Sequence, residues 1–323
     1  MAIATGTFTT YATVGIREQL MNSIYNISPE DTPFVTAIGR SKTKNTSPEW
    51  QTDALAASSD SAVLEGDEYS YSTPTATARL KNICQINRKT VTISGTDQAV
   101  EKAGRADEIG YQMEKKAAEL LLDMEKACVG VNQASVAGNT TTIRRVGSLS
   151  SWLTTNVSRG SGGANGGYNS GTGLTVAATD GTQRAFAESQ LKSVMQAAFT
   201  AGGKPSIAMM SPGQKVNFSA FAGNAVNRVD NAPAKGSTAQ MAIMAAADVY
   251  KSDFGNLTAV PNRENRTRDV FLLDPRYAEI AYLRPFVRDK PAKTGDADKR
   301  ALLVEWTLVV KNEAAHGVIA DLS

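Results

Sequence analysis

Two short stretches of the sequence contain residue types that acyl-transfer enzymes use. Residues 41–44 read Ser-Lys-Thr-Lys and residues 293–295 read Lys-Thr-Gly. They match the S-x-x-K and K-T-G pieces of penicillin-binding enzymes, in which the serine is the nucleophile. The S-D-N piece is missing, and Lys293 lies in a loop punctuated by Pro and Asp rather than on a strand. We therefore interpret both matches as chance.

The other chemistry-bearing residues are too few or too scattered to form a site. Cys84, Cys128 and His316 cannot supply a Cys/His zinc centre, and we expect His316 to be a packed or surface histidine. The stretch AGGKPS around Lys204 lacks the first glycine and the Ser/Thr of a phosphate loop, and no G-x-S-x-G elbow occurs. We predict no catalytic residue, no metal site and no cofactor.

Composition limits the class of protein further. The chain has 323 residues, 41% of them hydrophobic, and a net charge of +2, so it can bury a large core but lacks the basic excess of a DNA-wrapping protein. Two cysteines argue against a secreted disulfide framework and favour folding in the cytosol. The start of the chain does not resemble a signal peptide, and no apolar run approaches the ~20 residues of a membrane span.

The first 49 residues read as an irregular arm. Ser28-Pro29, Thr32-Pro33 and Ser47-Pro48 interrupt any long element, although a short helix over residues 14–24 is expected. Three apolar residues recur at intervals, namely Phe34, Val35 and Ile38. We expect them to pin the arm to a surface, either the chain's own or that of a neighbouring copy.

Residues 50–94 read as a long β-hairpin. The second half alternates β-branched and polar residues, which is typical of a strand, with a bend or bulge expected near Arg88-Lys89. The tip, SSDSAVLEGDEYS, is too polar and acidic to form a core. A strand of about a dozen residues extends ~40 Å, twice the ~20 Å radius of gyration of a compact chain of this length. The hairpin should therefore project and lie on a partner.

The strongest helix prediction covers residues 105–131. Apolar residues recur there at helical spacing, namely Ile109, Met113, Ala117, Leu120, Met124, Ala127 and Val131. Residues 132–183 are rich in Gly, Ser, Thr and Asn, and we predict a flexible loop in RGSGGANGGYNSGTG.

The remaining sequence predicts alternating helices and strands. A helix carries Phe186, Leu191, Val194, Met195 and Ala198 and ends near Gly202. Ser211 and Pro212 begin a short helix after a strand. A hairpin turns at residues 253–256, and further strands follow in DVFLLDP and AEIAYLRPF. In the last strand, Leu302, Val304, Trp306, Leu308 and Val310 face one way, whereas Glu305, Thr307 and Lys311 face the other.

The order of these parts resembles a family, the major capsid proteins of tailed bacteriophages with the Hong Kong 97 fold. Specific phrases resemble the branch typified by phages of the SU-ten kind, over nearly the whole chain. They are EGDEYSYSTPTATARLKNICQINRKTVTISGT, GYQMEKKAAELLLDMEKA, YKSDFGNLTAVPNR and TGDADKRALLVEWTLVVKNEAAHGVIADL.

The resemblance implies an α+β fold with these regions: an N-terminal arm (1–49), an extended β-hairpin loop (50–94), a peripheral domain (95–183) with a spine helix (105–131), an axial domain (184–285) and a C-terminal strand that returns to the peripheral domain (286–323). It implies a shell around double-stranded DNA, built from pentamers and hexamers of this chain. The expected candidates for contact between subunits are Phe34, Val63, Leu64, Tyr69, Arg79, Lys81, Arg88 and Lys89.

The resemblance also sets expectations about partners and location. They include a portal, a possible decoration protein and packaged DNA contacted non-specifically, with no membrane. Because Met1 is followed almost directly by arm-like sequence, we expect a separate scaffolding protein. Residues 50–78 contain no lysine, so we expect no covalent crosslink from the loop tip. The chain is expected in the virion after assembly in the host cytoplasm.

Two alternative functions stay open at this point. Bacterial nanocompartments use the same fold, so a cargo-holding shell protein is the nearest alternative. A non-catalytic β-rich surface protein is a different class and is disfavoured by the missing signal peptide.

Overall fold

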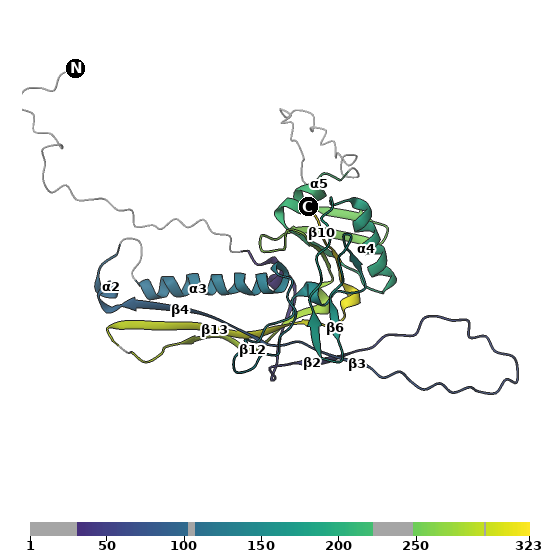
Figure 1. The fold of residues 1–323 in the computed structure, drawn as a ribbon, viewed down its shortest axis with the longest axis horizontal. Helices are drawn as coiled ribbons and strands as arrows, with labels where there is room; N and C mark the ends of the chain where they lie inside the picture. Colours follow the sequence, from purple (N-terminus) through teal and green to yellow (C-terminus); the bar gives the residue numbers. More distant parts are fainter. Residues whose placement is uncertain (1–30, 103–106, 222–247, 294) are drawn as a thin grey trace, which may run out of the picture.

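The computed structural model describes residues 31–102, 107–221, 248–293 and 295–323. Figure 1 shows a long, thin plate joined at one end to a compact body, with an extended loop that projects away from both. The plate consists of helix α3 lying along a sheet of four strands, and the body is built around a sheet of six strands. The expected helix over residues 14–24 lies outside the described residues.

The sheet of the plate has the strand order β1-β12-β13-β4. The strands are β1 (Gly39–Lys42), β4 (Gln85–Ser94), β12 (Ala278–Asp289) and β13 (Ala297–Val310). β1 pairs with β12 in parallel, and β13 pairs antiparallel with both β12 and β4. The predicted domain boundary between residues 285 and 286 therefore falls inside one strand, β12.

Helix α3 (Glu108–Glu125) confirms the main helix prediction and continues as a π-helical turn (Lys126–Gly130). It begins where the Asp107 carboxylate accepts the N–H of Ile109 at 3.0 Å, an N-cap that satisfies an otherwise unpaired helix donor. Position 105, where the prediction began, lies outside the described residues. The predicted stripe faces the sheet, since Met113 and Leu120 pack with Leu302 of β13.

The body contains the sheet β5-β14-β11-β8-β10-β9. Its strands are β5 (Val157–Ser158), β8 (Ile207–Met210), β9 (Val249–Ser252), β10 (Gly255–Pro261), β11 (Val270–Leu273) and β14 (Gly317–Ile319). Helices α4 (Glu188–Thr200) and α5 (Pro212–Ser219) confirm two further predictions, including the Ser211 N-cap, whose side chain accepts the N–H of Gln214. The short strand β14, which follows β13 in the sequence, belongs to the sheet of the body.

The predicted hairpin is correct at its base and wrong beyond it. β2 (Glu49–Thr52) pairs antiparallel with β3 (Ala78–Lys81), and residues 53–77 form a loop without strands. The later part, β4, belongs to the plate. The expected bulge at Arg88-Lys89 is absent, because β4 pairs with β13 without a break. The alternation of buried and exposed residues changes phase just before β4 instead. There the buried Asn82 side chain donates to the Leu308 carbonyl at 2.6 Å.

The glycine-rich segment is ordered, contrary to the prediction of a flexible loop. β6 (Gly167–Asn169) and β7 (Leu174–Val176) form a small hairpin. The buried Asp321 carboxylate accepts the N–H groups of Gly160 at 3.0 Å and Gly181 at 2.8 Å, and also a hydrogen bond from Arg268 at 2.9 Å. These contacts with residues far away in the sequence hold the segment in place. Its glycine-rich composition alone therefore does not show whether it is ordered.

The short helical elements complete the fold. They are α1 (Pro33–Ala37), α2 (Gly95–Ala99) and the 3-10 turns Leu149–Ser151, Pro275–Tyr277 and Glu313–Ala315. The largest core cluster includes α1, the end of α3 and the even-numbered residues of β13 from Val304 to Val310. The predicted polar face of β13 is also covered, because Glu305 and Thr307 are buried.

Candidate assembly surfaces

The loop of residues 53–77 is the largest part of the described chain that packs against nothing. Its apolar side chains range from 77% exposed at Val63 to 99% at Leu55, and Leu64, Tyr69 and Tyr71 fall between. The loop also carries five acidic residues and no basic one, the acidic residues being Asp53, Asp60, Glu65, Asp67 and Glu68. Exposed apolar residues within one segment are typical of a surface that a partner covers.

A stack of aromatic rings fixes the base of this loop. Trp50 of β2 lies against the buried Trp152 with ring centroids 5.4 Å apart, and Tyr168 of β6 stacks on Trp152 with ring centroids 5.6 Å apart. Beside the stack, Arg79 forms an ion pair with Glu49 at 3.3 Å. Both residues line a polar hollow of about 310 Å³ together with Lys81. The loop therefore leaves the subunit from a rigid base.

The root of the arm is anchored within the same subunit. Phe34 and Val35 are buried in the main core, and their backbone N–H groups donate to the Glu125 carboxylate at 2.8 and 2.9 Å. Phe34 has no exposed surface in the single chain. The expectation that it contacts a neighbouring subunit is therefore corrected, because its own core already covers it.

The predicted basic contact residues divide into two groups. Lys89 is held within its own subunit by Asp123 of α3 at 2.8 Å, and this hydrogen bond raises the pKa of the Lys89 ammonium. Arg79 is paired with Glu49, whereas Arg88 is exposed on β4 and forms no ion pair within the part of the chain that the structure describes. Val63, Leu64 and Tyr69 are exposed, so these three, with Arg88, keep a free surface for a neighbour.

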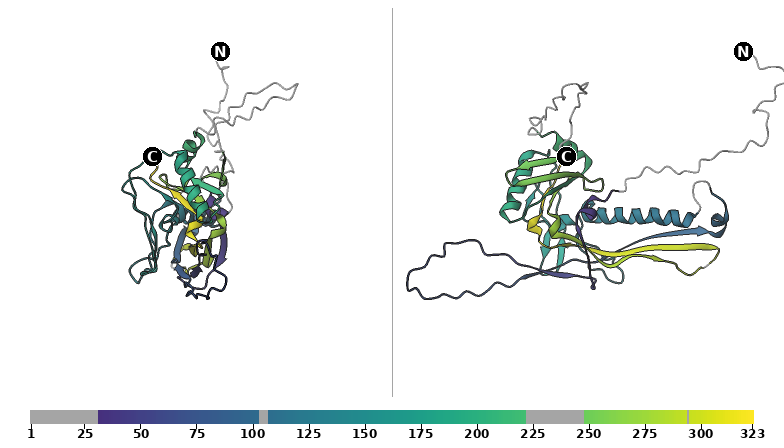
Figure 2. Two further views of the ribbon diagram at one scale, coloured as in Figure 1. Left: turned by 90° about the vertical axis from the view of Figure 1, so that its right-hand side faces the viewer. Right: turned by 180° about the vertical axis from the view of Figure 1, so that it is seen from behind.

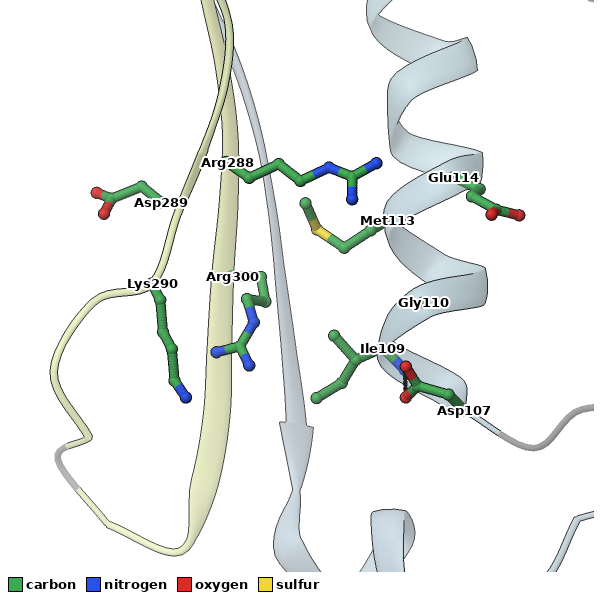
Figure 3. A pocket seen from close by; sticks show the side chains of 9 residues that line it. All are labelled: Asp107, Ile109, Gly110, Met113, Glu114, Arg288, Asp289, Lys290 and Arg300. Atoms are coloured by element: carbon green, nitrogen blue, oxygen red, sulfur yellow. Dashed lines mark hydrogen bonds between the residues drawn. The ribbon is translucent and has the colours of Figure 1, made fainter.

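A cleft at the far end of the plate was not among the predicted sites. It has a volume of about 360 Å³ and lies between the first turns of α3 and the end of the β12–β13 hairpin. Figure 3 shows Arg288 directed toward α3, whereas Lys290 and Arg300 extend toward the turn of the hairpin, and Ile109 and Met113 lie along the helix side. The signal in the sequence was the basic run RDKPAKTGDADKR at residues 288–300, which reads only as a loop without the fold.

A buried charge cluster stiffens the middle of the plate. The carboxylate of Glu305 accepts hydrogen bonds from Arg144 at 2.6 Å and from Arg284 at 2.8 Å. Glu305 is only 3% exposed, and a buried carboxylate is stable only when cations or donors satisfy both oxygens. The cluster joins β12 and β13 at the point where their register shifts, so its role is structural.

The residues with reactive side chains that the sequence singled out are not brought together in the fold. Ser41 donates to Glu279 at 2.9 Å near the start of β12, whereas Lys293 lies past the far end of that strand and pairs with Asp298. Burial raises the pKa of the Cys84 thiol to about 11 and that of Cys128 well above its usual value. His316 is fully buried, as expected for a packed histidine, and its pKa is lowered to about 4 by burial.

Two further kinds of site do not occur among the described residues. No group of three or more His, Cys, Asp or Glu side chains in these ranges is arranged to hold a metal ion. Within the same ranges, no helix combines the length and the apolar character needed to cross a membrane.

The fold is that of tailed-phage capsid proteins. A structure from Gordonia phage Cozz covers 99% of this chain and 97% of its own, with a TM-score of 0.60 at 13% identity. The capsid of a native GTA particle matches 97% of this chain and 98% of its own, with a TM-score of 0.61 at 11% identity. The cyanophage A-1(L) capsid matches the same shares, with a TM-score of 0.60 at 12% identity. These similarities show that the chain has the Hong Kong 97-like fold.

The family follows from the sequence. The model of the SU10 major capsid protein family matches residues 3–323, and the chain belongs to that family. A major capsid protein of Escherichia phage Phieco32 is 38% identical over 120 residues, which are 37% of this chain and 34% of that protein. The match thus spans about a third of the length of this curated relative.

Proposed function

We propose that many copies of this chain assemble into the closed icosahedral shell that encloses the double-stranded DNA of a tailed phage. The observation that carries the proposal is the loop of residues 53–77, which is exposed along its length but leaves the subunit from a rigid aromatic base. Membership of a major capsid protein family supports the same role. A neighbouring copy is the partner that would cover the loop.

The regions of the subunit take different parts in this proposal. The plate with α3 corresponds to the peripheral domain, and the body corresponds to the axial domain that clusters around fivefold and sixfold axes. The strand pairing suggests two changes to the predicted boundaries: residues 278–285 go with the plate, and residues 317–319 go with the body. The loop lies over the adjacent subunit of the shell.

The partners beyond further copies of the chain are also proposals. A Phage G structure is described as major capsid proteins with decoration proteins, at 8% identity and a TM-score of 0.56, covering all of both chains. We propose a decoration partner for this chain, together with a portal, a scaffolding protein and DNA contacted without sequence preference. Assembly would take place in the host cytoplasm, and the role would be structural rather than catalytic.

Of the two alternatives, neither has an observation of its own in its favour. A nanocompartment shell would share the fold, but the matching family model and the curated relative are phage major capsid proteins. A β-rich surface protein does not account for a long helix lying along a sheet.

Electron microscopy of the chain expressed alone, and with the products of neighbouring genes, tests the proposed function. We expect closed shells of uniform size that contain pentamers and hexamers. Isolated subunits or irregular aggregates under every co-expression condition would contradict the proposal.

A further inference from the structure

The glycine-rich segment contains a pair of residues that can change its own covalent structure. Asn165 is followed directly by Gly166, and no other Asn-Gly pair occurs in the sequence. In such a pair the backbone nitrogen of the glycine can attack the side-chain carbonyl carbon of the asparagine. Glycine favours this attack because it has no Cβ to hinder the approach and because it adopts the backbone conformations that the product requires.

Both reacting groups are accessible in the folded chain. The left view of Figure 2 shows the teal segment that contains the pair at the periphery of the molecule, and the Asn165 side chain is exposed. Among the described residues, the N–H of Gly166 has no hydrogen-bond acceptor. It can therefore lose its proton to hydroxide, as unprotected amides do in hydrogen exchange.

The hydrogen bond that restrains the side-chain amide is easily replaced. The amide nitrogen of Asn165 donates to the Thr154 carbonyl at 2.8 Å. Both partners are exposed, so water can take the place of either one at little net cost. The amide carbon can then turn toward the Gly166 nitrogen.

A guanidinium lies against the oxygen of the same amide. Arg159 Nε donates to Asn165 Oδ1 at 3.2 Å, and a donor at this oxygen stabilises the negative charge that develops there during the attack. The two terminal nitrogen atoms of Arg159 are buried and have no hydrogen-bond partner among the described residues. Burial lowers the pKa of Arg159, although Asp269 and Asp321 favour its charge. A carboxylate at position 165 would supply the acceptor that this guanidinium lacks.

We propose that Asn165 deamidates spontaneously in the folded chain and leaves a carboxylate beside Arg159. A bond forms between the Gly166 nitrogen and Cγ of Asn165, the Cγ–Nδ2 bond breaks, and ammonia leaves with the proton of the Gly166 N–H. Water then opens the cyclic imide at either of its carbonyls and gives an aspartate or an isoaspartate at position 165. The reaction consumes only water, and no group is oxidised or reduced.

The aspartate product exchanges one contact of the segment for another. It can no longer donate to the Thr154 carbonyl, but both of its oxygens can accept hydrogen bonds from Arg159. Hydrogen bonds between a guanidinium and a carboxylate are stronger than those between a guanidinium and a neutral amide. The segment that carries β6 and β7 should therefore be held at least as firmly after conversion to aspartate.

Peptide mapping of the full chain tests the proposal, with an internal control. Trypsin cuts after Arg159 and Arg184 and releases residues 160–184 as one peptide, which contains Asn165 and Asn169. Asn169 is the control, because Ser170 follows it and its side-chain oxygen accepts the N–H of Gly171 at 2.9 Å. After several weeks at mildly alkaline pH, mass spectrometry should show at least about tenfold more conversion at Asn165 than at Asn169.

Two further measurements identify the route. The rate at Asn165 should rise about tenfold for each pH unit, because hydroxide must first remove the proton of the Gly166 N–H. In N165Q the longer side chain places the carbonyl carbon out of reach, so position 165 should stay unchanged while Asn169 behaves as in the wild type. A rate at Asn165 that does not depend on pH would overturn this route.

A sample unfolded in urea and treated in parallel shows that the conversion can be detected. Conversion in the unfolded sample without conversion in the folded chain would overturn the proposal, and so would equal conversion at Asn165 and Asn169. None of these measurements requires shells, since unassembled subunits serve equally well. Failure of the proposed function would therefore leave this test intact.

Thermal melting tests what the product does. N165D should melt at or above the temperature of the wild type, because its carboxylate pairs with Arg159. N165A loses the contacts with both Arg159 and Thr154 and should melt below the wild type. If N165D melted at a lower temperature than N165A, the pairing of the new carboxylate with Arg159 would be overturned.

Discussion

The Glu125 carboxylate at the end of α3 accepts the backbone N–H of Phe34 at 2.8 Å. Its second oxygen accepts the N–H of Val35 at 2.9 Å, and the side chain of Asn262, which follows β10, donates to the first oxygen at 2.6 Å. One buried carboxylate thus joins the root of the arm, the long helix and the body.

Removing this anchor should destabilise the subunit. Glu125→Ala leaves two backbone N–H groups of α1 and one amide of Asn262 without their acceptor in a buried place. We expect the free energy of unfolding to fall by about 3–5 kcal/mol, measured by urea denaturation. Glu119→Ala is the matched control on the same helix, because Glu119 makes only partly exposed ion pairs, with Lys116 and Lys89. An equal loss in both variants would contradict the anchor.

The pH dependence of the same anchor has a defined sign. Burial raises the pKa of the Glu125 carboxyl despite its three hydrogen bonds, so the folded subunit holds the proton more tightly than the unfolded chain does. The contribution of Glu125 to stability should be fully present below its unfolded pKa and fall as pH rises through the folded value. The difference in unfolding free energy between wild type and Glu125→Gln should therefore favour the wild type most at low pH. A difference that grows with pH would contradict this.

His316 should make the subunit sensitive to mild acid. Its pKa falls from 6.5 to about 4 on folding, so the folded state binds the proton less tightly than the unfolded state. The stability it contributes is present above pH 6.5 and is lost as pH falls toward 4. Between pH 7 and pH 5 we expect a loss of about 2 kcal/mol in the free energy of unfolding.

His316→Asn is the control for this titration. Its amide oxygen can replace Nδ1, which accepts the N–H of Asp274 at 3.3 Å, but it does not titrate. Since His316 is the only histidine in the sequence, the slope of stability between pH 7 and pH 5 should be smaller in the variant. An unchanged slope would show that other groups cause it.

The aromatic rings at the base of the loop should stabilise the pairing of β2 with β3. Trp50→Ala removes the ring that lies against Trp152, and we expect a loss of about 1–2 kcal/mol because Trp50 is only partly buried. Hydrogen exchange of the backbone amides of β2 and β3 should become faster. Tyr71→Ala, at a residue that is 93% exposed, should leave the exchange of the isolated subunit unchanged. Unaltered exchange in Trp50→Ala would contradict the anchoring role.

The stripe of α3 should tolerate no charge. Met124 has no exposed surface, so Met124→Asp places a carboxylate among apolar groups and should cost at least about 3 kcal/mol. Lys115→Asp, on the exposed side of the same helix, should change the free energy of unfolding by less than about 1 kcal/mol. Urea denaturation of both variants is the measurement. Similar values for the two would show that the stripe is not buried.

Elements with strong local patterns could be predicted from the sequence. The helical spacing of Met113, Leu120 and Met124 placed α3 correctly, and Ser211-Pro212 marked the start of α5. In β13 the alternation from Leu302 to Val310 identified the face that joins the core. Each of these signals lies within one short segment, so no knowledge of distant residues is needed.

The parts that were predicted wrongly depend on distant residues. Gly160 and Gly181 are ordered by Asp321, which is far away in the sequence, and Asn82 breaks the strand by bonding to Leu308. Of the predicted contact residues, Phe34 is buried because Glu125 holds α1 in the core. The cleft beside the start of α3 was missed because Arg288 and Arg300 become neighbours only when β12 pairs with β13.

The central claim is that the loop serves assembly and not the fold of its own subunit. The direct test replaces residues 58–70 with a short Gly-Ser turn. The deleted residues are exposed and shortening a loop costs little entropy, so circular dichroism and the melting temperature of the isolated subunit should match the wild type. Electron microscopy should show no stable shells, because the ~1–2 kcal/mol lost at each contact is repeated at every copy. Shells of wild-type stability, or a variant subunit that cannot fold, would contradict the account.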